Sequence, residues 1–287
     1  MIIDMHTHSF PDKIAAGTIR KLSSLSHTVP FTDGTESGLQ ETNKTAGIDL
    51  AVVLPVATAP QQVEKINRFA AEKNRSCRES GILSFAAMHP DCPDWRDELQ
   101  RCAQSGFAGI KIHPVYQETD LDDPRYLRIC DLAAELGLAV VTHAGLDVGY
   151  PGVVRCSPQM IRQVMREVDG LTLIAAHMGG WRNWEEVPEL LADTGVYLDT
   201  AFATGAMHPL DDGHYRPEDL PMLTAEQFME LFRAFGAHRI LFGTDRPWSD
   251  PAESLAFIRQ LPLPEEDKAA ILGGNAGRLL GLAAGDC

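Results

Sequence analysis

Four histidines and one aspartate stand at the ends of short apolar runs, where they could hold a metal ion. His6 and His8 follow the run "MIIDM", and His143 ends "LAVVTH". His177 ends "LTLIAAH", and Asp245 ends "RILFGTD". Neutral imidazoles and carboxylates are protein ligands of zinc and related divalent metals. A lone histidine of this kind is more often a core residue, but the recurrence at several run ends predicts a metal site.

The His-Thr-His spacing places two imidazoles on one side of a strand. Side chains two residues apart in a β-strand share a face. His6 and His8 can therefore reach the same ion, and Thr7 between them is expected to point away from it. Asp4, two residues earlier, either supports these ligands or helps to fix the strand.

The candidate ligands need a scaffold that brings strand ends together. Eight apolar runs, rich in Val, Ile, Leu and Ala, alternate with helical patterns, as expected of parallel strands covered on both faces. Such a chain forms a (β/α)8 TIM barrel or a doubly wound sheet. We favour the α/β barrel, because it gathers polar residues from the carboxyl ends of many strands into one mouth. The expected strands are 1–6, 48–55, 82–90, 106–114, 138–145, 171–180, 195–201 and 239–245.

The segments between the runs carry helix and loop signals. Ser157, Thr224 and Asp250 each have the type and position of a helix N-cap. Two stretches, 26–45 and 202–222, have no regular apolar pattern and are expected to be irregular connections. Loops of this length are more often functional than idle.

Length, charge and cysteine use exclude several classes of protein. We expect residues 1–287 to form one domain, since the length fits one large barrel. A net charge of -15 disfavours a nucleic-acid partner, which needs a basic face. The apolar runs are too short for a membrane span, which takes about 18 residues or more. Six scattered cysteines indicate free thiols, and with no targeting signal recognised we expect a cytoplasmic protein.

The chain resembles the amidohydrolase superfamily, in particular the metal-dependent TIM-barrel branch that contains aminocarboxymuconate semialdehyde decarboxylase. The stretches "IIDMHTHSFP", "GFAGIKIHP", "FGTDRPW" and "GNAGRLLGL" carry the resemblance across the whole chain. It implies one divalent metal held by His6, His8, His143 and Asp245, with zinc the first expectation, and a homodimer. It also implies that His177 orients a water on the metal and that Asp245 transfers a proton.

Lys111 leaves the number of metals open. It lies in the "GIKIHP" stretch, and some branches of the superfamily carry a carboxylated lysine there that bridges two metals. Lys111 could do this with His143 and His177, could contact a substrate carboxylate, or could pair with a buried acid. We favour one metal with Lys111 beside it.

Substrate contacts are expected in the loops that follow the strands. Arginines in such a mouth suit a small anionic substrate, because a guanidinium matches a carboxylate. The main candidates are Arg155, Trp181, Arg246, Trp248 and His113. Arg182, His208 and His214 also stand in these loops. His89 and His113 each precede a proline and are as well explained as loop anchors.

Several functions fit these residues. The first is a hydrolase that uses metal-activated water on an amide, lactone or ester carbonyl. An alternative is non-oxidative decarboxylation of an unsaturated or aromatic acid by the same site. A Schiff-base aldolase using Lys111 is an alternative of another class, but it leaves the histidines unexplained. A barrel with a closed, purely structural metal site is the non-catalytic alternative.

Overall fold

Each of the eight predicted strand segments coincides with a shorter parallel strand, and the first strand ends at Thr7, one residue beyond its segment. The computed structural model of the chain describes residues 1–282. The third segment is interrupted at Phe85 and so contains two short strands. The strands of the ring are β1 (Ile3–Thr7), β2 (Leu50–Val53), β3 (Ile82–Ser84), β4 (Ala86–Ala87), β5 (Gly109–Ile112), β6 (Ala139–Thr142), β9 (Leu173–Ala175), β10 (Tyr197–Asp199) and β11 (Ile240–Leu241).

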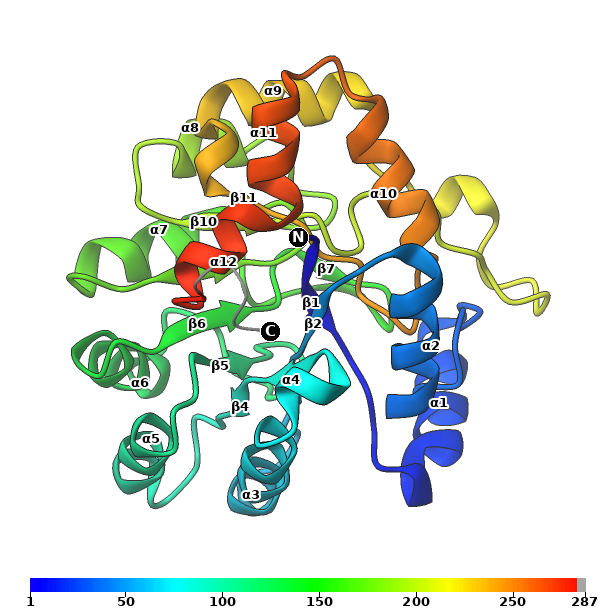
Figure 1. The fold of residues 1–287 in the computed structure, drawn as a ribbon. Coiled ribbons are helices and arrows are strands. Elements are labelled where there is room, and N and C mark those ends of the chain that lie inside the picture. The colour runs from blue at the N-terminus through cyan, green and yellow to red at the C-terminus, as the bar shows by residue number, and fades with distance from the viewer. Residues whose placement is uncertain (283–287) are drawn as a thin grey trace.

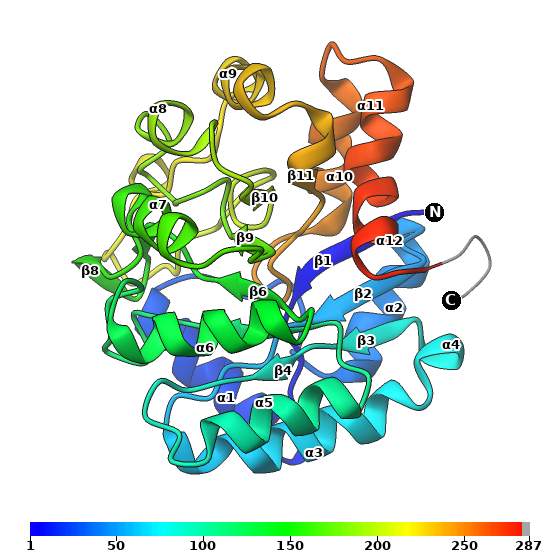
Figure 2. The same ribbon diagram turned by 90° about the vertical axis from the view of Figure 1, so that its left-hand side faces the viewer.

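These strands close into a barrel (Figures 1 and 2). Hydrogen-bonded neighbours follow the orders β1-β2-β3 and β4-β5-β6-β9-β10-β11. The seam between β1 and β11 is joined by backbone hydrogen bonds: Met5 N donates to Phe242 O, and Asp245 N donates to His6 O, both at 2.8 Å. The (β/α)8 TIM barrel predicted from the sequence is confirmed.

Helices surround the ring, as Figure 1 shows in a view close to the barrel axis. The α-helices are α1 (Asp12–Ser26), α2 (Glu36–Ala46), α3 (Val63–Asn74), α4 (Cys77–Ser80), α5 (Trp95–Gln104), α6 (Pro124–Glu135), α7 (Pro158–Glu167), α8 (Val187–Leu191), α9 (Ala225–Phe235), α10 (Pro251–Gln260), α11 (Glu265–Ala269) and α12 (Asn275–Leu279). Short 3-10 helices are η1 (Pro60–Gln62), η2 (Pro217–Asp219) and η3 (Ala237–Arg239), and η4 (Ala270–Gly274) is a π-helix.

The predicted helix caps are confirmed. The side chains of Ser157, Thr224 and Asp250 accept backbone hydrogen bonds at the starts of α7, α9 and α10. The prediction for 26–45 is wrong in part, because α2 occupies its second half, capped by Thr35. This helix is mostly polar and buries only Leu39 and Asn43, so it has almost no apolar stripe to reveal it.

One of the loops after the strands holds a β-hairpin that the sequence did not predict. A hairpin of β7 (Leu146–Asp147) and β8 (Tyr150–Val154) follows β6 at the barrel mouth. Residues 202–222 form a long irregular connection, as predicted, and contain only the short helix η2. Apolar residues of this connection, including Phe202 and Met207, pack against Trp181.

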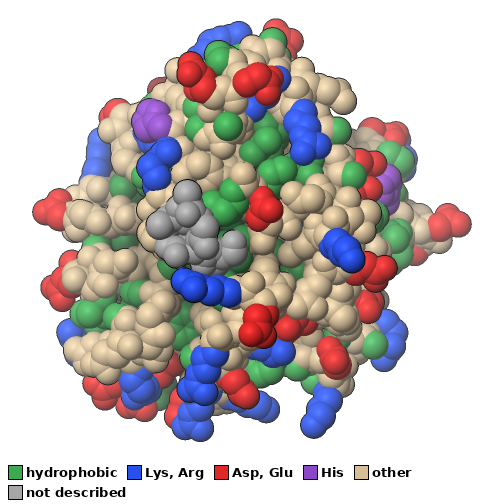
Figure 3. All heavy atoms as spheres, viewed as in Figure 1, with side chains coloured by type: hydrophobic (Ala, Val, Ile, Leu, Met, Phe, Trp, Pro, Cys, Tyr) green, Lys and Arg blue, Asp and Glu red, His purple; other side chains and the backbone are tan. Residues whose placement is uncertain are grey.

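Apolar packing fills the barrel and closes the end where its strands begin. Ile3, Met5, Val141 and Leu241 belong to one buried cluster, which Ala276 of α12 joins. A larger cluster lies between the strands and the surrounding helices. Figure 3 shows the same face as Figure 1, with acidic and basic side chains around its rim and hydrophobic side chains between them.

The predictions about membrane-spanning helices and cysteines can be compared with residues 1–282. Among them, no helix is both long and apolar enough to cross a membrane. Five of the six cysteines are buried and form no disulfide within residues 1–282, whereas Cys287 lies outside the described residues.

Candidate metal centre and its cavity

Three predicted metal ligands converge at the seam of the barrel. His6 and His8 lie at the end of β1, and Asp245 follows β11. The Nε2 atom of His8 lies 3.0 Å from Asp245 Oδ1, and the Nε2 atom of His6 lies 3.4 Å from the same oxygen. These three side chains form one group whose ligand atoms lie close enough to share an ion.

Hydrogen bonds fix which nitrogen of each imidazole faces Asp245. His8 Nδ1 lies 2.8 Å from the carbonyl oxygen of Leu54, which can only accept, so Nδ1 carries the hydrogen. His6 Nδ1 lies 2.8 Å from Asp199 Oδ2 and donates to that carboxylate in the same way. With neutral rings, both Nε2 atoms therefore present lone pairs toward Asp245.

Two imidazole nitrogens then face one carboxylate oxygen, at 3.0 and 3.4 Å. Asp245 Oδ1 is buried and makes no hydrogen bond within the described residues 1–282. Burial would raise the pKa of Asp245, but the positive charges that His6 and His8 carry when protonated more than offset this and hold the pKa well below its usual value. Burial holds the pKa of His6 well below its usual value too, so that ring is neutral. A divalent cation fits such a set of two imidazoles and a carboxylate.

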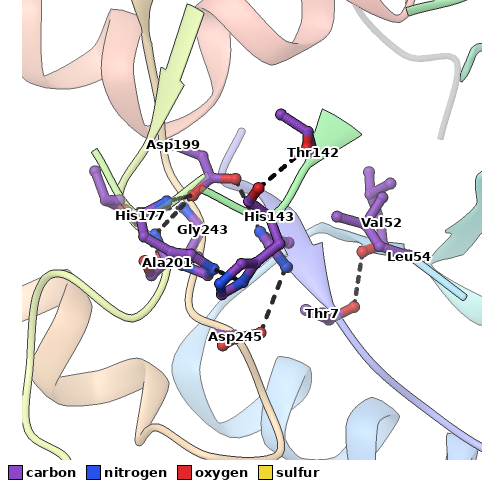
Figure 4. Close-up of polar contacts among 12 residues, drawn as sticks. Thr7, Val52, Leu54, Thr142, His143, His177, Asp199, Ala201, Gly243 and Asp245 are labelled. Atoms are coloured by element: carbon purple, nitrogen blue, oxygen red, sulfur yellow. Dashed lines mark hydrogen bonds and ion pairs between the residues drawn. The ribbon is translucent and has the colours of Figure 1, made fainter. Parts of the chain in front are cut away.

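His143 and His177 lie beside this group and contact each other (Figure 4). His177 Nε2 is 3.0 Å from His143 Nδ1, and His177 Nδ1 is 2.8 Å from the carbonyl oxygen of Ala201. His143 does not belong to the group formed by His6, His8 and Asp245. Its Nε2 atom is nevertheless buried and has no hydrogen-bond partner among the residues that the structure describes. A role for His143 as fourth ligand stays a prediction.

Both candidate catalytic residues have left-handed backbone. The φ angle is 61° at His177 and 64° at Asp245. This conformation costs about 1 kcal/mol or more for residues other than glycine, although His and Asp tolerate it better than most. Such conformations cluster at functional sites.

Lys111 lies against the proposed ligands. Its Nζ atom is 3.3 Å from His6 Nε2, and the side chain is buried. Burial lowers the pKa of Lys111 to about 8, while nearby Asp199 and Asp245 raise it. The ammonium thus approaches the same nitrogen that would bind a metal. Its role as a metal bridge or a substrate contact stays a prediction.

Two buried carboxylates at the site were missed in the sequence. Asp199, the last residue of β10, holds His6 through Nδ1 and also accepts from the backbone N–H of His177 at 3.0 Å. Carboxylates that orient metal-binding histidines in this way are typical of metalloenzymes. A carboxylate at a strand end was the available signal.

Asp147 could not be found by that signal, because it lies in the hairpin after β6. Its Oδ2 atom is 3.6 Å from His113 Nε2 and 3.9 Å from His143 Nε2. The ring of His113 stacks between His143 and Tyr116, with centroid distances of 4.3 and 3.9 Å. Burial raises the pKa of Asp147 to about 7. His113, Asp147 and Tyr116 thus form one wall of the cavity.

The prediction that Arg246 binds substrate is wrong. Its side chain is fully buried and does not line the cavity. Nη2 donates to Asp4 Oδ2 at 2.8 Å, and Nη1 donates to Thr42 Oγ1 at 2.9 Å. Asp4 also accepts from Thr244. Asp4 and Arg246 therefore fix β1 to the segment after β11.

Arg246→Met is expected to destabilise the fold rather than to change substrate binding. Breaking a buried ion pair leaves the carboxylate of Asp4 uncompensated, which costs about 3–5 kcal/mol. Urea denaturation followed by circular dichroism measures this loss. Arg155→Met is the matched control, because Arg155 pairs with Asp120 at the surface, and such pairs contribute about 1 kcal/mol at most. Equal stability of the two variants would contradict the structural role of Arg246.

The remaining loop candidates divide into two groups. Trp248 and His113 line the cavity at the barrel mouth, whereas Arg155 and Trp181 do not. Trp181 is buried and donates through Nε1 to the carbonyl oxygen of Pro221 at 3.2 Å. Its predicted contact with substrate is not supported by this placement.

Three other candidates, and one predicted loop anchor, also lie outside the cavity lining. Arg182 stacks over Trp181, and His214 stacks on His27 with ring centroids 3.7 Å apart. His208 is exposed. His89 accepts from the backbone N–H of Asp91, as a loop anchor does.

One cavity contains the whole ligand group. It has a volume of about 1250 Å³ and is lined by His6, His8, Lys111, His177 and Asp245, among other residues. These side chains lie at the carboxyl ends of the strands, where TIM-barrel enzymes carry their active sites. The geometry offers a buried group of metal ligands, an ionised carboxylate and a buried lysine facing one space.

Known proteins share this fold. The family model described as amidohydrolase matches residues 3–282. A gamma-resorcylate decarboxylase from Rhizobium sp. (strain MTP-10005) is 24% identical, over 71% of this chain and 72% of that protein.

Solved structures match nearly the whole chain. An uncharacterised TIM-barrel protein from Bordetella bronchiseptica has a TM-score of 0.75 and 17% identity, over 98% of both chains. A dihydroxybenzoic acid decarboxylase from Polaromonas sp. JS666, with bound manganese and the inhibitor 2-nitroresorcinol, has a TM-score of 0.66 and 17% identity. That match covers 98% of this chain and 96% of the decarboxylase.

Proposed function

The chain belongs to the amidohydrolase family, and we propose that it is a metal-dependent decarboxylase of an aromatic or unsaturated carboxylic acid. The observation that carries the proposal is the convergence of His6 Nε2, His8 Nε2 and Asp245 Oδ1 on one point in the cavity. Relatives named as decarboxylases of hydroxybenzoic acids favour this chemistry over others. Hydrolysis, the first expectation from the sequence, has no comparable support.

We propose one divalent metal ion held by His6, His8 and Asp245, with His143 as a candidate fourth ligand. Zinc was the first expectation, but the Polaromonas decarboxylase holds manganese, and the ligand set suits either metal. When bound, the ion would act as a Lewis acid toward oxygen atoms of the substrate.

Decarboxylation requires the residues of the chain to deliver one proton to the substrate carbon. Loss of carbon dioxide from a carboxylate leaves an electron pair on carbon, and a proton must take the place of the carbon dioxide. Asp245 and His177 lie at the cavity wall, where they could carry and direct that proton. Both are fixed in place, His177 by Ala201 and His143, and Asp245 by its backbone bond to His6. Lys111 lies on the same side and could hold a substrate carboxylate.

A product assay tests the proposed reaction. Purified protein, loaded in parallel with manganese and with zinc, is incubated with hydroxybenzoic acids and with matched esters, lactones and amides. We expect carbon dioxide and the corresponding phenol in equal amounts, with both products lost on chelation and restored by metal. Hydrolysis of the esters, lactones or amides without release of carbon dioxide would overturn the proposal.

The same preparation tests the Schiff-base alternative. Burial gives Lys111 a pKa of about 8, which favours a nucleophilic amine more than an ordinary lysine would. Borohydride is added with a carbonyl substrate, and mass spectrometry then looks for a reduced adduct on Lys111. An adduct, together with activity that survives chelation, would replace the metal mechanism with an aldolase.

A further inference from the structure

The cavity continues well beyond the ligand group. From the barrel mouth it extends over the surfaces of α1 and α2 on one side and of η1 and α3 on the other. Pockets for small molecules usually measure about 300–1000 Å³, and this one measures about 1250 Å³. A single-ring acid seated at Asp245 would leave much of this space unfilled.

Most lysines of the chain line this one cavity. The lysines of the sequence are Lys13, Lys21, Lys44, Lys65, Lys73, Lys111 and Lys268. All except Lys44 and Lys268 line the cavity. Lys111 lies at the ligand group. The other four line the outer part of the cavity, Lys13 and Lys21 from α1 and Lys65 and Lys73 from α3. We call this outer part of the cavity the lysine arm. This concentration of cations contrasts with the net charge of -15 of the whole chain.

Three of the lysines in the lysine arm lack a counter-charge. Within residues 1–282, Lys13, Lys21 and Lys65 are exposed and form no ion pair, while Lys73 pairs with Glu36 at 2.7 Å. Two acidic residues, Asp12 and Glu36, also line this part of the cavity. Four cations against two anions leave the lysine arm net positive.

The lysine arm also has apolar walls and a defined length. Ile14 on α1 and Phe69 on α3 line it and are 53% and 42% exposed, so each presents apolar surface to whatever enters. Lys13 and Lys21 are eight residues apart on one helix, and a helix rises 1.5 Å per residue, so they span about 12 Å. Lys65 and Lys73 have the same spacing on α3. The lysine arm therefore offers apolar contact with cations spread along both walls.

We propose that the lysine arm binds the distal anionic group of an elongated substrate whose reactive carboxylate lies at Asp245. This inference rests on the proposed function and narrows the substrate class to an acid with an apolar body and a second anionic group, a carboxylate or a phosphate. Lysine ammonium groups bind both anions as point charges. Exposed lysines in solvent bind weakly one by one, so recognition depends on several of them acting together along the apolar walls.

Equilibrium binding tests the lysine arm without turnover. The probes are phenylhexanoate, phenylhexyl phosphate and the neutral phenylhexanol, titrated into the metal-loaded protein by calorimetry. We expect at least one anionic probe to bind about tenfold or more tightly than the alcohol, and the stronger of the two identifies carboxylate or phosphate. This preference should fall to about twofold or less in the triple variant Lys13→Gln/Lys21→Gln/Lys65→Gln. The control Lys44→Gln, an exposed lysine outside the cavity, should keep it.

The outcomes separate this inference from the proposed function. A lysine-dependent preference for anionic probes supports the lysine arm even if the protein releases no carbon dioxide from any acid. Equal binding of all three probes, or a preference that survives the triple substitution, overturns it even if decarboxylation is found. A third result, in which only the oligomeric state measured by sedimentation responds to the triple substitution, would assign the surface to a second copy of the chain and also overturn it.

Discussion

Replacing Asp245 with alanine is expected to remove both the bound metal and the turnover. Its Oδ1 atom approaches the Nε2 atoms of His6 and His8, so the substitution removes the only negative ligand of the proposed set. We expect metal content near zero after dialysis and a fall in kcat of about 10³-fold or more. Elemental analysis gives metal per chain, and the decarboxylation assay gives kcat.

Two further variants sharpen this test. His6→Ala should lose metal and turnover to a similar extent, because it removes a second member of the same set. Asp193→Ala is a suitable control, since Asp193 pairs with Arg162 at the protein surface. A metal content near two per chain in the unaltered protein would assign a second ion and favour Lys111 as a bridging ligand. An Asp245→Ala protein that keeps its metal would remove Asp245 from the ligand set.

His177→Asn is expected to keep the metal and to lose turnover. His177 lies outside the group of His6, His8 and Asp245, so the proposed ion keeps those ligands. Loss of a positioned imidazole should lower kcat by about 10²–10⁴-fold. Asparagine is preferred over alanine because it tolerates the left-handed backbone at this position.

The measurement has to separate chemistry from folding. Metal per chain and the urea midpoint should match those of the unaltered protein, while kcat falls. Loss of metal in His177→Asn would show that His177 binds the ion directly. Full activity would remove His177 from the catalytic residues.

The strands were predictable because both of their faces are buried against apolar side chains. Parallel strands covered on both faces are apolar throughout, and this makes each run visible in the sequence. Most predicted segments run a few residues past their strand, since the chain then leaves the extended conformation, as at His177 and Asp245 with φ angles of 61° and 64°. Helix α2 was missed for the opposite reason, because its sequence is polar and only Leu39 and Asn43 are buried.

The proposed ligands were predictable only as far as strand ends reveal them. His6, His8 and Asp245 come together as the barrel requires, whereas His143 lies next to His177. Arg246 was misjudged because closeness in sequence to Asp245 was taken as closeness to the cavity. The backbone at Asp245 is left-handed, with a φ angle of 64°, so the direction of the next side chain could not be read from strand alternation. Asp147 depends on a hairpin whose path no periodicity in the sequence indicates.

The seam between β1 and β11 links metal affinity to folding. The strands that meet there come from opposite ends of the chain, and the proposed ligands stand on both sides of the join: His6 and His8 on one, Asp245 on the other. An ion bound only by the closed barrel adds its binding free energy to the stability of the fold, about 2.7 kcal/mol at a concentration 100 times its Kd. The supply of metal would thus set the lifetime of the protein as well as its activity, since chains without metal would open more often at the join between their first and last strands.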